Sequence, residues 1–303
     1  MALSHSEEAR KLTTEFAPSR RVALRFVAGE TLDDALDVIR RSNNRGIRVT
    51  LDHLGENVTS AEEARRAAND YVVALQAIGA DGLDANVSLK LTQMGLDVDA
   101  DLCRANLERI LAVAAENNNS VRIDMESSEY TKRTLDLYAT LREAGFDNVG
   151  VVIQAYLYRS EGDIARLIDL GASVRLCKGA YDERSTVAYP HKRDVDAHYV
   201  VLMKTLLSPR AREQGVRAAI ATHDESIIWS TREYLAEQGL PKEAVEFQML
   251  YGVRPALQQR LADEGYPVRV YVPYGTEWYP YLMRRLGERP ANVIFLAKNF
   301  LRA

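Results

Sequence analysis

The chain has 303 residues, of which 47% are hydrophobic and 27% are charged, so it is long and apolar enough to bury one large core. Its formal net charge of −4 and its sequence pI of about 5.8 argue against a nucleic-acid-binding surface. No segment approaches the roughly 18 consecutive apolar residues of a membrane-spanning helix, so any membrane contact is expected to be peripheral.

The N-terminal segment is predicted to be helical and to lie outside the main fold. It lacks the basic and apolar regions of a secretory signal. Thr31 and Asp34 have the spacing of a capping box, and apolar residues follow at helical intervals. We therefore predict a helical extension over residues 1–44 that covers or flanks the domain that follows.

Eight short, β-rich apolar runs then recur along the chain, nearly all followed by sequence of helical period. This pattern predicts an α/β fold of the (β/α)8 barrel type, forming one catalytic domain over residues 45–303. In such barrels, catalytic residues lie where the strands end and the βα loops begin. The runs are IRVTLDH (47–53), VSLKL (87–91), VRIDM (121–125), GVVIQ (150–154), SVRLCK (173–178), RAAIATHD (217–224), VEFQML (245–250) and VRVYVPY (268–274).

The alternation of side chains along three of these runs predicts which charged residues point into the barrel. If the apolar sets of each run face the helices, then Lys90, Asp124 and Arg175 point toward the barrel axis near its C-terminal end. An unpaired buried charge costs several kcal/mol as an order of magnitude, so this convergence favours a charged ligand. The alternative is an internal layer of ion pairs that serves the fold.

The last predicted helix, from about residue 276, has an unusual polar face. Tyr281, Arg284, Arg285 and Glu288 recur at i, i+3, i+4 and i+7, where a barrel helix normally presents apolar residues. Two adjacent arginines differ by about 100° of rotation, so both can contact one carboxylate. The alternative is an exposed arginine pair with Glu288 as its partner.

Six segments of the chain share one resemblance, and they are RIDMESSEYT, VVIQAYLYR, VRLCKGAY, ATHD, FQMLYG and YLMRRLGERPAN. Together they resemble the proline dehydrogenase family, in its stand-alone bacterial form. The resemblance implies a distorted (β/α)8 barrel that holds FAD at its C-terminal end. It also implies oxidation of L-proline to Δ1-pyrroline-5-carboxylate by hydride transfer to flavin N5, as the first step of proline degradation to glutamate. Electrons would pass to a membrane quinone, with peripheral contact at the inner face of the cell membrane.

The resemblance also implies a role for individual residues. Asp124 would be the active-site carboxylate and Arg175 the arginine near flavin N5. The substrate would contact Lys90, Leu250, Tyr271, Tyr281, Arg284 and Arg285, with the two arginines on its carboxylate. FAD would contact Met125, Gln154, Arg175, Lys178, Gly179, Ala180, Thr222 and His223. One departure from the family pattern is Asp182, where many relatives carry an aromatic residue that packs on the flavin.

Several of these residues have a structural alternative. His223 could simply be a hydrogen-bonded residue at a strand end, and Gln154 could cap a strand. Asp124 could pair with Arg122 or Lys90.

Three other function classes remain open on the sequence. A metal-dependent lyase or hydrolase would draw ligands from Asp52, His53, Asp124, Glu126, His223 and Asp224, although they form no HxH or HxxxD cluster. A Schiff-base aldolase would use Lys90 or Lys178. A non-catalytic carboxylate-binding barrel is the third class.

Two further patterns bear on the cofactor and the compartment. No GxGxxG motif follows a strand, so a Rossmann-type nucleotide site is unsupported. Cys103 and Cys177 form neither a CxxC nor a CxxH spacing, so neither a disulfide framework nor a structural zinc site is indicated. A reducing compartment, the cytoplasm, fits best.

Overall fold

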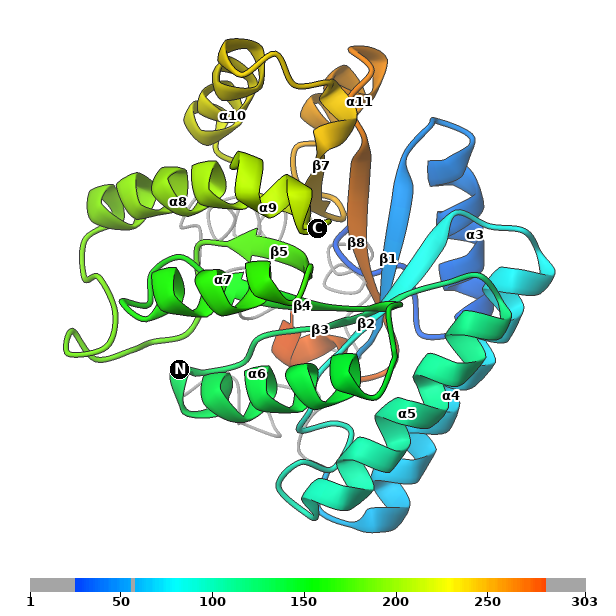
Figure 1. Ribbon diagram of the computed structural model, residues 1–303. Coiled ribbons are helices and arrows are strands. Elements are labelled where there is room, and N and C mark those ends of the chain that lie inside the picture. The colour runs from blue at the N-terminus through cyan, green and yellow to red at the C-terminus, as the bar shows by residue number, and fades with distance from the viewer. Residues whose placement is uncertain (1–24, 56–57, 282–303) are drawn as a thin grey trace, which may run out of the picture.

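The computed structural model describes residues 25–55 and 58–281. In this part of the chain, eight parallel strands close into a barrel in the order of the sequence, because β1 pairs with both β2 and β8 (Figure 1). The prediction of a (β/α)8 barrel is therefore confirmed. The strands are β1 Arg48–His53, β2 Ala85–Leu89, β3 Val121–Ile123, β4 Val149–Gln154, β5 Ser173–Cys177, β6 Arg217–Ala221, β7 Val245–Leu250 and β8 Val268–Tyr274.

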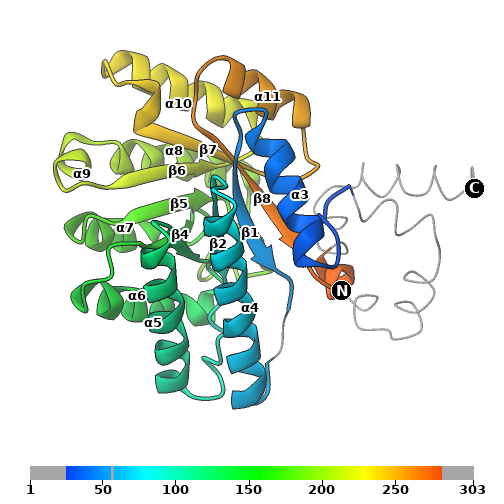
Figure 2. The same cartoon turned by 90° about the vertical axis from the view of Figure 1, so that its right-hand side faces the viewer.

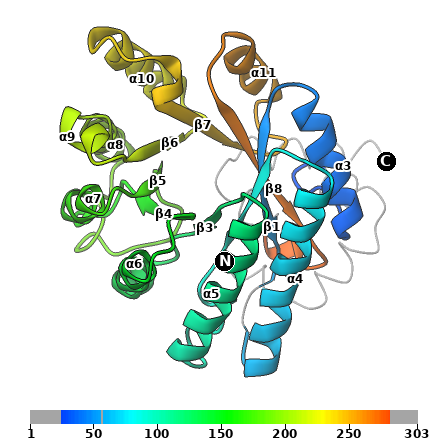
Figure 3. The same cartoon turned by 45° about the vertical axis from the view of Figure 1, so that its right-hand side comes forward.

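The helices of the described residues lie outside these strands (Figures 1 and 3). One precedes the barrel, α3 Leu32–Asn43, and Figure 2 shows it beside β1 and β8. The others are α4 Ala61–Ala80, α5 Ala100–Glu116, α6 Ser128–Glu143, α7 Ser160–Asp169, α8 Lys192–Leu206, α9 Pro209–Glu213, α10 Glu225–Glu237, the short 3-10 helix η2 Lys242–Ala244, and α11 Pro255–Asp263.

The ends of the strands decide where the site residues lie. β2 ends at Leu89, β3 at Ile123 and β6 at Ala221. Lys90, Asp124, Met125, Thr222 and His223 therefore lie just beyond their strands, in the loops at the C-terminal end of the barrel.

The alternation of side chains divides the strands as predicted. Val87 and Leu89 of β2, like Val174 and Leu176 of β5, belong to one apolar core with residues of the helices. The hydroxyl oxygen of Ser88 in β2 instead accepts a hydrogen bond from Arg175 Nη1 in β5, at 3.3 Å. Because β3 and β4 separate these strands in the sheet, the contact can form only across the barrel interior.

The start of helix α3 has the capping box that the sequence predicts. Thr31 accepts a hydrogen bond from the backbone of Asp34, and the Asp34 carboxylate accepts one from the backbone of Thr31, so the capping box is formed. The helix packs against β1 and β8. The boundary between an extension over residues 1–44 and the barrel stays a prediction, since residues 1–24 lie outside the described part.

Two general properties of the described residues bear on compartment and membrane contact. Neither cysteine is in a disulfide. None of the described helices combines the length and the apolar composition that crossing a membrane requires.

Candidate active site

The carboxylate of Asp124 is the centre of a cluster at the C-terminal end of the barrel. Its Oδ1 accepts hydrogen bonds from Ser88 Oγ and from Arg175 Nη1, both at 2.6 Å, and its Oδ2 accepts one from the Tyr271 hydroxyl at 2.7 Å. The three donors come from β2, β5 and β8, and the carboxylate follows β3. Only 14% of the Asp124 side chain and 8% of the Arg175 side chain are exposed, so this is a buried and paired charge.

Arg175 is held from a second side. Its Nε donates to Gln248 Oε1 at 2.5 Å, and its guanidinium carbon lies 5.3 Å from the centre of the Tyr271 ring. Burial, reinforced by the charge of Asp124, raises the pKa of Tyr271 well above its usual value, so the hydroxyl stays protonated and donates. The cluster thus fixes one orientation of the guanidinium.

Lys90 lies next to a second buried carboxylate. Its Nζ is 3.7 Å from Oδ2 of Asp52, whose side chain is only 1% exposed. The hydroxyl of Tyr71 lies 3.0 Å from Gln93 Oε1 and 3.3 Å from Asp52 Oδ1. The structure thus brings a second cation to the end of the barrel where Asp124 and Arg175 meet.

Residues after β3 and β4 form the next part of the rim. Gln154 is 3% exposed, and its amide nitrogen donates to the backbone carbonyl of Glu126 at 2.8 Å. Met125 is buried. Burial raises the pKa of the Glu126 carboxyl, which accepts hydrogen bonds from the backbone and hydroxyl of Thr92. The amide of Gln154, the last residue of β4, therefore joins this strand to the loop after β3.

Lys178, just after β5, is held by two carboxylates. Its Nζ contacts Asp196 and lies 2.8 Å from Asp224. The Lys178 hydrogen bond lowers the pKa of Asp224 strongly, and Lys192 adds to the shift. About a quarter of the Lys178 side chain is exposed, so the ammonium group is still accessible at the rim.

The two residues after Lys178 are small. Gly179 has a φ of +114°, and a Cβ built there would lie 2.3 Å from the ring of Tyr156. No other residue fits this position without moving the ring. Ala180 is exposed. The glycine thus lets the backbone pack against Tyr156, and only Ala180 adds a small side chain at the exposed rim.

The segment after β6 is fixed to the end of β7. Nε2 of His223 accepts a hydrogen bond from the backbone N–H of Leu250 at 2.9 Å, so this nitrogen carries no proton. Thr222 is buried, and its hydroxyl accepts from the backbone of Asp224 at 3.1 Å. Leu250 is half-buried at this junction.

Tyr281 lies in residues 278–281, the described start of the helix that follows β8, and its side chain is 5% exposed. Arg284 and Arg285 lie outside the described residues, so their predicted contact with a carboxylate stays a prediction. The residues that form one apolar cluster with Tyr281 are Phe26, Val27, Leu54, Trp278 and Tyr279.

Two contacts of this site were not assigned a role from the sequence. Ser88 shares the inward face with Lys90, and the alternation of VEFQML puts Gln248 on the face opposite Phe247 and Met249. The alternation of side chains along each strand could have identified both Ser88 and Gln248 as inward-facing. Conversely, Asp124 pairs with Arg175 and with neither Arg122 nor Lys90. Arg122 instead donates to Ser173 and Val151, deeper in the barrel.

The geometry weakens the metal and aldolase alternatives. In the part of the chain that the structure describes, no group of three or more His, Cys, Asp or Glu side chains is arranged to hold a metal ion. The carboxylate of Asp124 is occupied by donors, and His223 Nε2 by a backbone N–H. Lys178 contacts two carboxylates, whereas a Schiff-base lysine must be desolvated and neutral.

Known proteins resemble this chain over nearly its whole length. The family described as proline dehydrogenase matches residues 35–298. Proline dehydrogenase 1 of Bacillus subtilis subsp. natto is 45% identical over 295 residues, which is 96% of either protein. Proline dehydrogenase of Deinococcus radiodurans is 42% identical over 285 residues, 93% of this chain and 90% of that protein.

Solved structures give the same result for the fold. The structure of proline utilization A (PutA) from Bdellovibrio bacteriovorus, inactivated by N-propargylglycine, superposes with a TM-score of 0.83 at 28% identity. The match covers 92% of this chain and 33% of the other. The chain thus spans about a third of that longer protein.

Proposed function

Because the chain belongs to the proline dehydrogenase family and is thus an enzyme of proline catabolism, we propose that it oxidises L-proline to Δ1-pyrroline-5-carboxylate by hydride transfer to N5 of a bound FAD. The electrons then pass to a membrane quinone, which the protein meets by peripheral contact at the inner face of the cell membrane. The observation that carries the proposal is the buried cluster of Asp124, Arg175, Ser88 and Tyr271 at the C-terminal end of the barrel.

The residues at this end of the barrel fit a flavin nucleotide. Gly179 packs its backbone against the ring of Tyr156, which fixes the path of the chain beside Lys178, and in our proposal that lysine provides a positive charge for a diphosphate. Met125, Gln154 and Thr222 complete a mixed polar and apolar wall. When bound, FAD supplies the two-electron acceptor that no side chain of the protein can provide.

Arg175 provides the charge stabilisation that the reaction requires. Its guanidinium is buried and held on two sides, by Asp124 and Gln248, so it is already oriented when negative charge develops nearby. Asp124 also fixes the Tyr271 hydroxyl, and with it the wall on which the proline ring packs. We assign Asp124 and Arg175 as the catalytic pair on this basis.

The substrate is held by its carboxylate. Arg284 and Arg285 bind that group in our proposal, and Lys90 assists from the loop after β2. These cations also disfavour the ammonium form of the bound amine, whose lone pair must be free for the C–H bond beside it to break. Tyr281 and Leu250 limit the size of the substrate ring that fits. The site then accelerates the reaction chiefly by holding this ring close to the flavin in one orientation.

The test is proline-dependent reduction of a dye, and then of a soluble quinone analogue, by the purified protein. We expect the two visible absorption bands of oxidised flavin, bleached by proline. Arg284→Ala and Arg285→Ala should each raise the proline concentration at half-saturation, because a buried substrate charge loses a partner worth about 2 to 5 kcal/mol.

The matched control is Arg260→Ala, an exposed arginine of α11 that pairs with Glu225 and should leave saturation unchanged. A colourless protein that does not oxidise proline would overturn the proposal. Unchanged saturation in both arginine variants would move the carboxylate site to other residues.

A further inference from the structure

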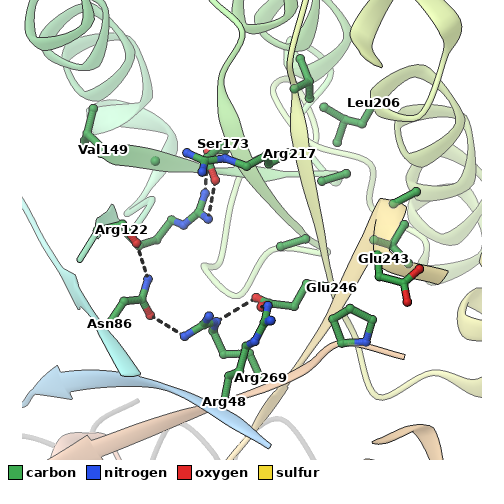
Figure 4. Close-up of a pocket in the computed structure, with 18 of the residues that line it drawn as sticks. Arg48, Asn86, Arg122, Val149, Ser173, Leu206, Arg217, Glu243, Glu246 and Arg269 are labelled. Atoms are coloured by element: carbon green, nitrogen blue, oxygen red, sulfur yellow. Dashed lines mark hydrogen bonds and ion pairs between the residues drawn. The ribbon is translucent and has the colours of Figure 1, made fainter. Parts of the chain in front are cut away.

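A second polar cavity lies at the opposite end of the barrel. Its volume is about 440 Å³, and it is lined by residues from the N-terminal ends of the strands, among them Arg48, Arg122, Arg217, Glu246 and Arg269 (Figure 4). In (β/α)8 barrels, this end normally serves stability and the other end chemistry. The residues of the proposed active site do not line this cavity.

The charges around this cavity do not balance. Its lining includes five arginines and two glutamates, with no other ionisable side chain apart from these. The local excess of positive charge contrasts with a chain whose net charge is −4. A pure stability role would favour equal numbers of opposite charges, because unpaired buried charge destabilises the fold.

Part of the positive charge is neutralised inside the protein. Glu246 accepts a hydrogen bond from Arg269 Nε at 2.8 Å and lies 3.3 Å from Arg48 Nη1. Asp84, just outside the lining, lies 3.3 Å from Arg48 Nε and 4.0 Å from Arg269 Nη2, so both of these arginines are paired. Figure 4 shows Arg269 and Arg48 beside Glu246 on one side of the cavity. This side of the cavity is an ion-pair layer of the kind that the sequence left open.

Arg122, across the cavity, is different. Its residue is 7% exposed, and among the described residues no carboxylate lies within 4.0 Å of it. Its guanidinium donates only to neutral oxygens, the carbonyls of Ser173 and Val151 and the Ser173 hydroxyl. Burial lowers the pKa of Arg122 to about 9; the charge of Arg175 adds to this effect, and the charge of Glu246 opposes it.

The chain makes room for this buried cation. A Cβ at Gly150 would lie 2.6 Å from Arg122 Nη1, so the glycine of β4 lets the guanidinium reach Ser173. Arg217, at the start of β6 and exposed, adds a second cation that has no carboxylate within 4.0 Å among the described residues. Two arginines that face one cavity, neither in contact with a carboxylate of the described residues, form a site for an anion.

We propose that the N-terminal end of the barrel binds a small multivalent oxyanion, of the phosphate or polycarboxylate class, between Arg122, Arg217 and Arg269. The anion supplies the counter-charge that Arg122 and Arg217 do not find within 4.0 Å among the described residues, and Arg269, already paired with Glu246, adds a third guanidinium. It contacts none of the residues proposed to bind proline or FAD, so the proposal does not rest on the proposed function.

The test is calorimetric titration of the purified full-length protein with inorganic phosphate and with citrate, at an ionic strength held constant with sodium chloride. We expect saturable binding of at least one of the two anions. The relative affinities for phosphate and citrate show whether the site prefers a phosphate or a polycarboxylate. Arg217→Gln should weaken binding about threefold or more, the Coulombic effect of one charge several ångströms away in a hydrated cavity.

A second variant, which removes a negative charge and not a positive one, makes the test specific. Glu243→Gln removes a negative charge from the lining and should strengthen binding by a similar factor. Both variants change residues that are exposed, so the fold is retained. The matched control is Arg210→Gln, an exposed arginine of α9 that pairs with Asp169 outside the cavity and should change nothing.

Two results would overturn the proposal. One is the absence of saturable binding of both anions. The other is binding that Arg284→Ala and Arg285→Ala abolish while Arg217→Gln and Glu243→Gln leave it unchanged, because the anion would then occupy the proposed proline site.

Discussion

Gly179 illustrates how a single residue can determine the shape of the proposed cofactor site. Its φ of +114° lies in the left-handed region, and the ring of Tyr156 occupies the place of a Cβ. Two separate effects therefore act against a side chain at this position, one from the backbone and one from packing. Gly82, with a φ of +61° and no atom within 4 Å of an added Cβ, has only the first.

Gly179→Ala should lower the free energy of unfolding by about 2 to 4 kcal/mol, the sum of a left-handed alanine and an overpacked contact. The control is Gly82→Ala, at φ +61° with no atom within 4 Å of the added Cβ, which should lose only about 1 to 2 kcal/mol. Urea denaturation measures both. Equal losses in the two variants would show that Tyr156 does not restrict this position.

At the scale of elements, α10 is joined to the rest of the rim through its first residues. Asp224 caps the helix, since its Oδ1 accepts from the backbone of Ser226 at 3.1 Å, and its Oδ2 lies 2.8 Å from Lys178 after β5. The Asp224 carboxylate thus caps the start of α10 and also binds the lysine of the loop after β5. The same side chain acts as a cap and as half of an ion pair.

Asp224→Asn should separate these two actions, because asparagine caps helices as well as aspartate but carries no charge. The pKa of Asp224 is strongly lowered, chiefly by Lys178, so its charge stabilises the fold above the unfolded-state pKa of about 3.9 and loses this effect as the pH falls below it. We expect the variant to be less stable by about 1 to 3 kcal/mol at pH 7 and the difference to shrink below about pH 4.

Urea denaturation at pH 7 and pH 3.5 measures this difference. The control is Asp99→Asn, which caps α5 through Leu102 and has no cation within ion-pair distance among the described residues. It should change stability little at either pH. A difference for Asp224→Asn that does not depend on pH would contradict the ion-pair explanation.

At the scale of the whole molecule, one hydrogen-bonded chain connects the two ends of the barrel. Asp124 accepts from Arg175, Arg175 donates to Gln248, the Gln248 amide nitrogen donates to Glu246 at 2.6 Å, and Glu246 accepts from Arg269. These residues belong to four different strands or their ends. The interior of the barrel therefore contains a polar network that runs from one end to the other, with apolar packing outside it.

This network predicts that distant substitutions are coupled. In a double-mutant cycle, Asp124→Asn and Glu246→Gln should show an interaction of about 0.5 kcal/mol or more, although the two carboxylates make no direct hydrogen bond. Asp124→Asn with Glu243→Gln serves as the control and should be additive. Additive behaviour of both pairs would show that Gln248 does not transmit the effect.

The alternation of apolar and polar residues predicted the barrel, and it placed Lys90, Asp124 and Arg175 on the inner face. It did so because the face of a strand residue depends only on local geometry. The same pattern put Arg122 and Asp124 on one face, yet they serve opposite ends of the barrel. Two residues of a strand are separated by about 7 Å along it, enough to give them different neighbours.

What the sequence determined by itself is therefore the order of strands and helices, the inward set of charges and the family to which the chain belongs. The tertiary structure decided which charges pair: Asp124 with Arg175, Lys90 beside Asp52, and Arg122 with no carboxylate within 4.0 Å in the described ranges 25–55 and 58–281. The physical reason is closure of the barrel. Contacts across its interior join strands that are not neighbours, and they depend on the height of each residue along the axis, which no local pattern contains.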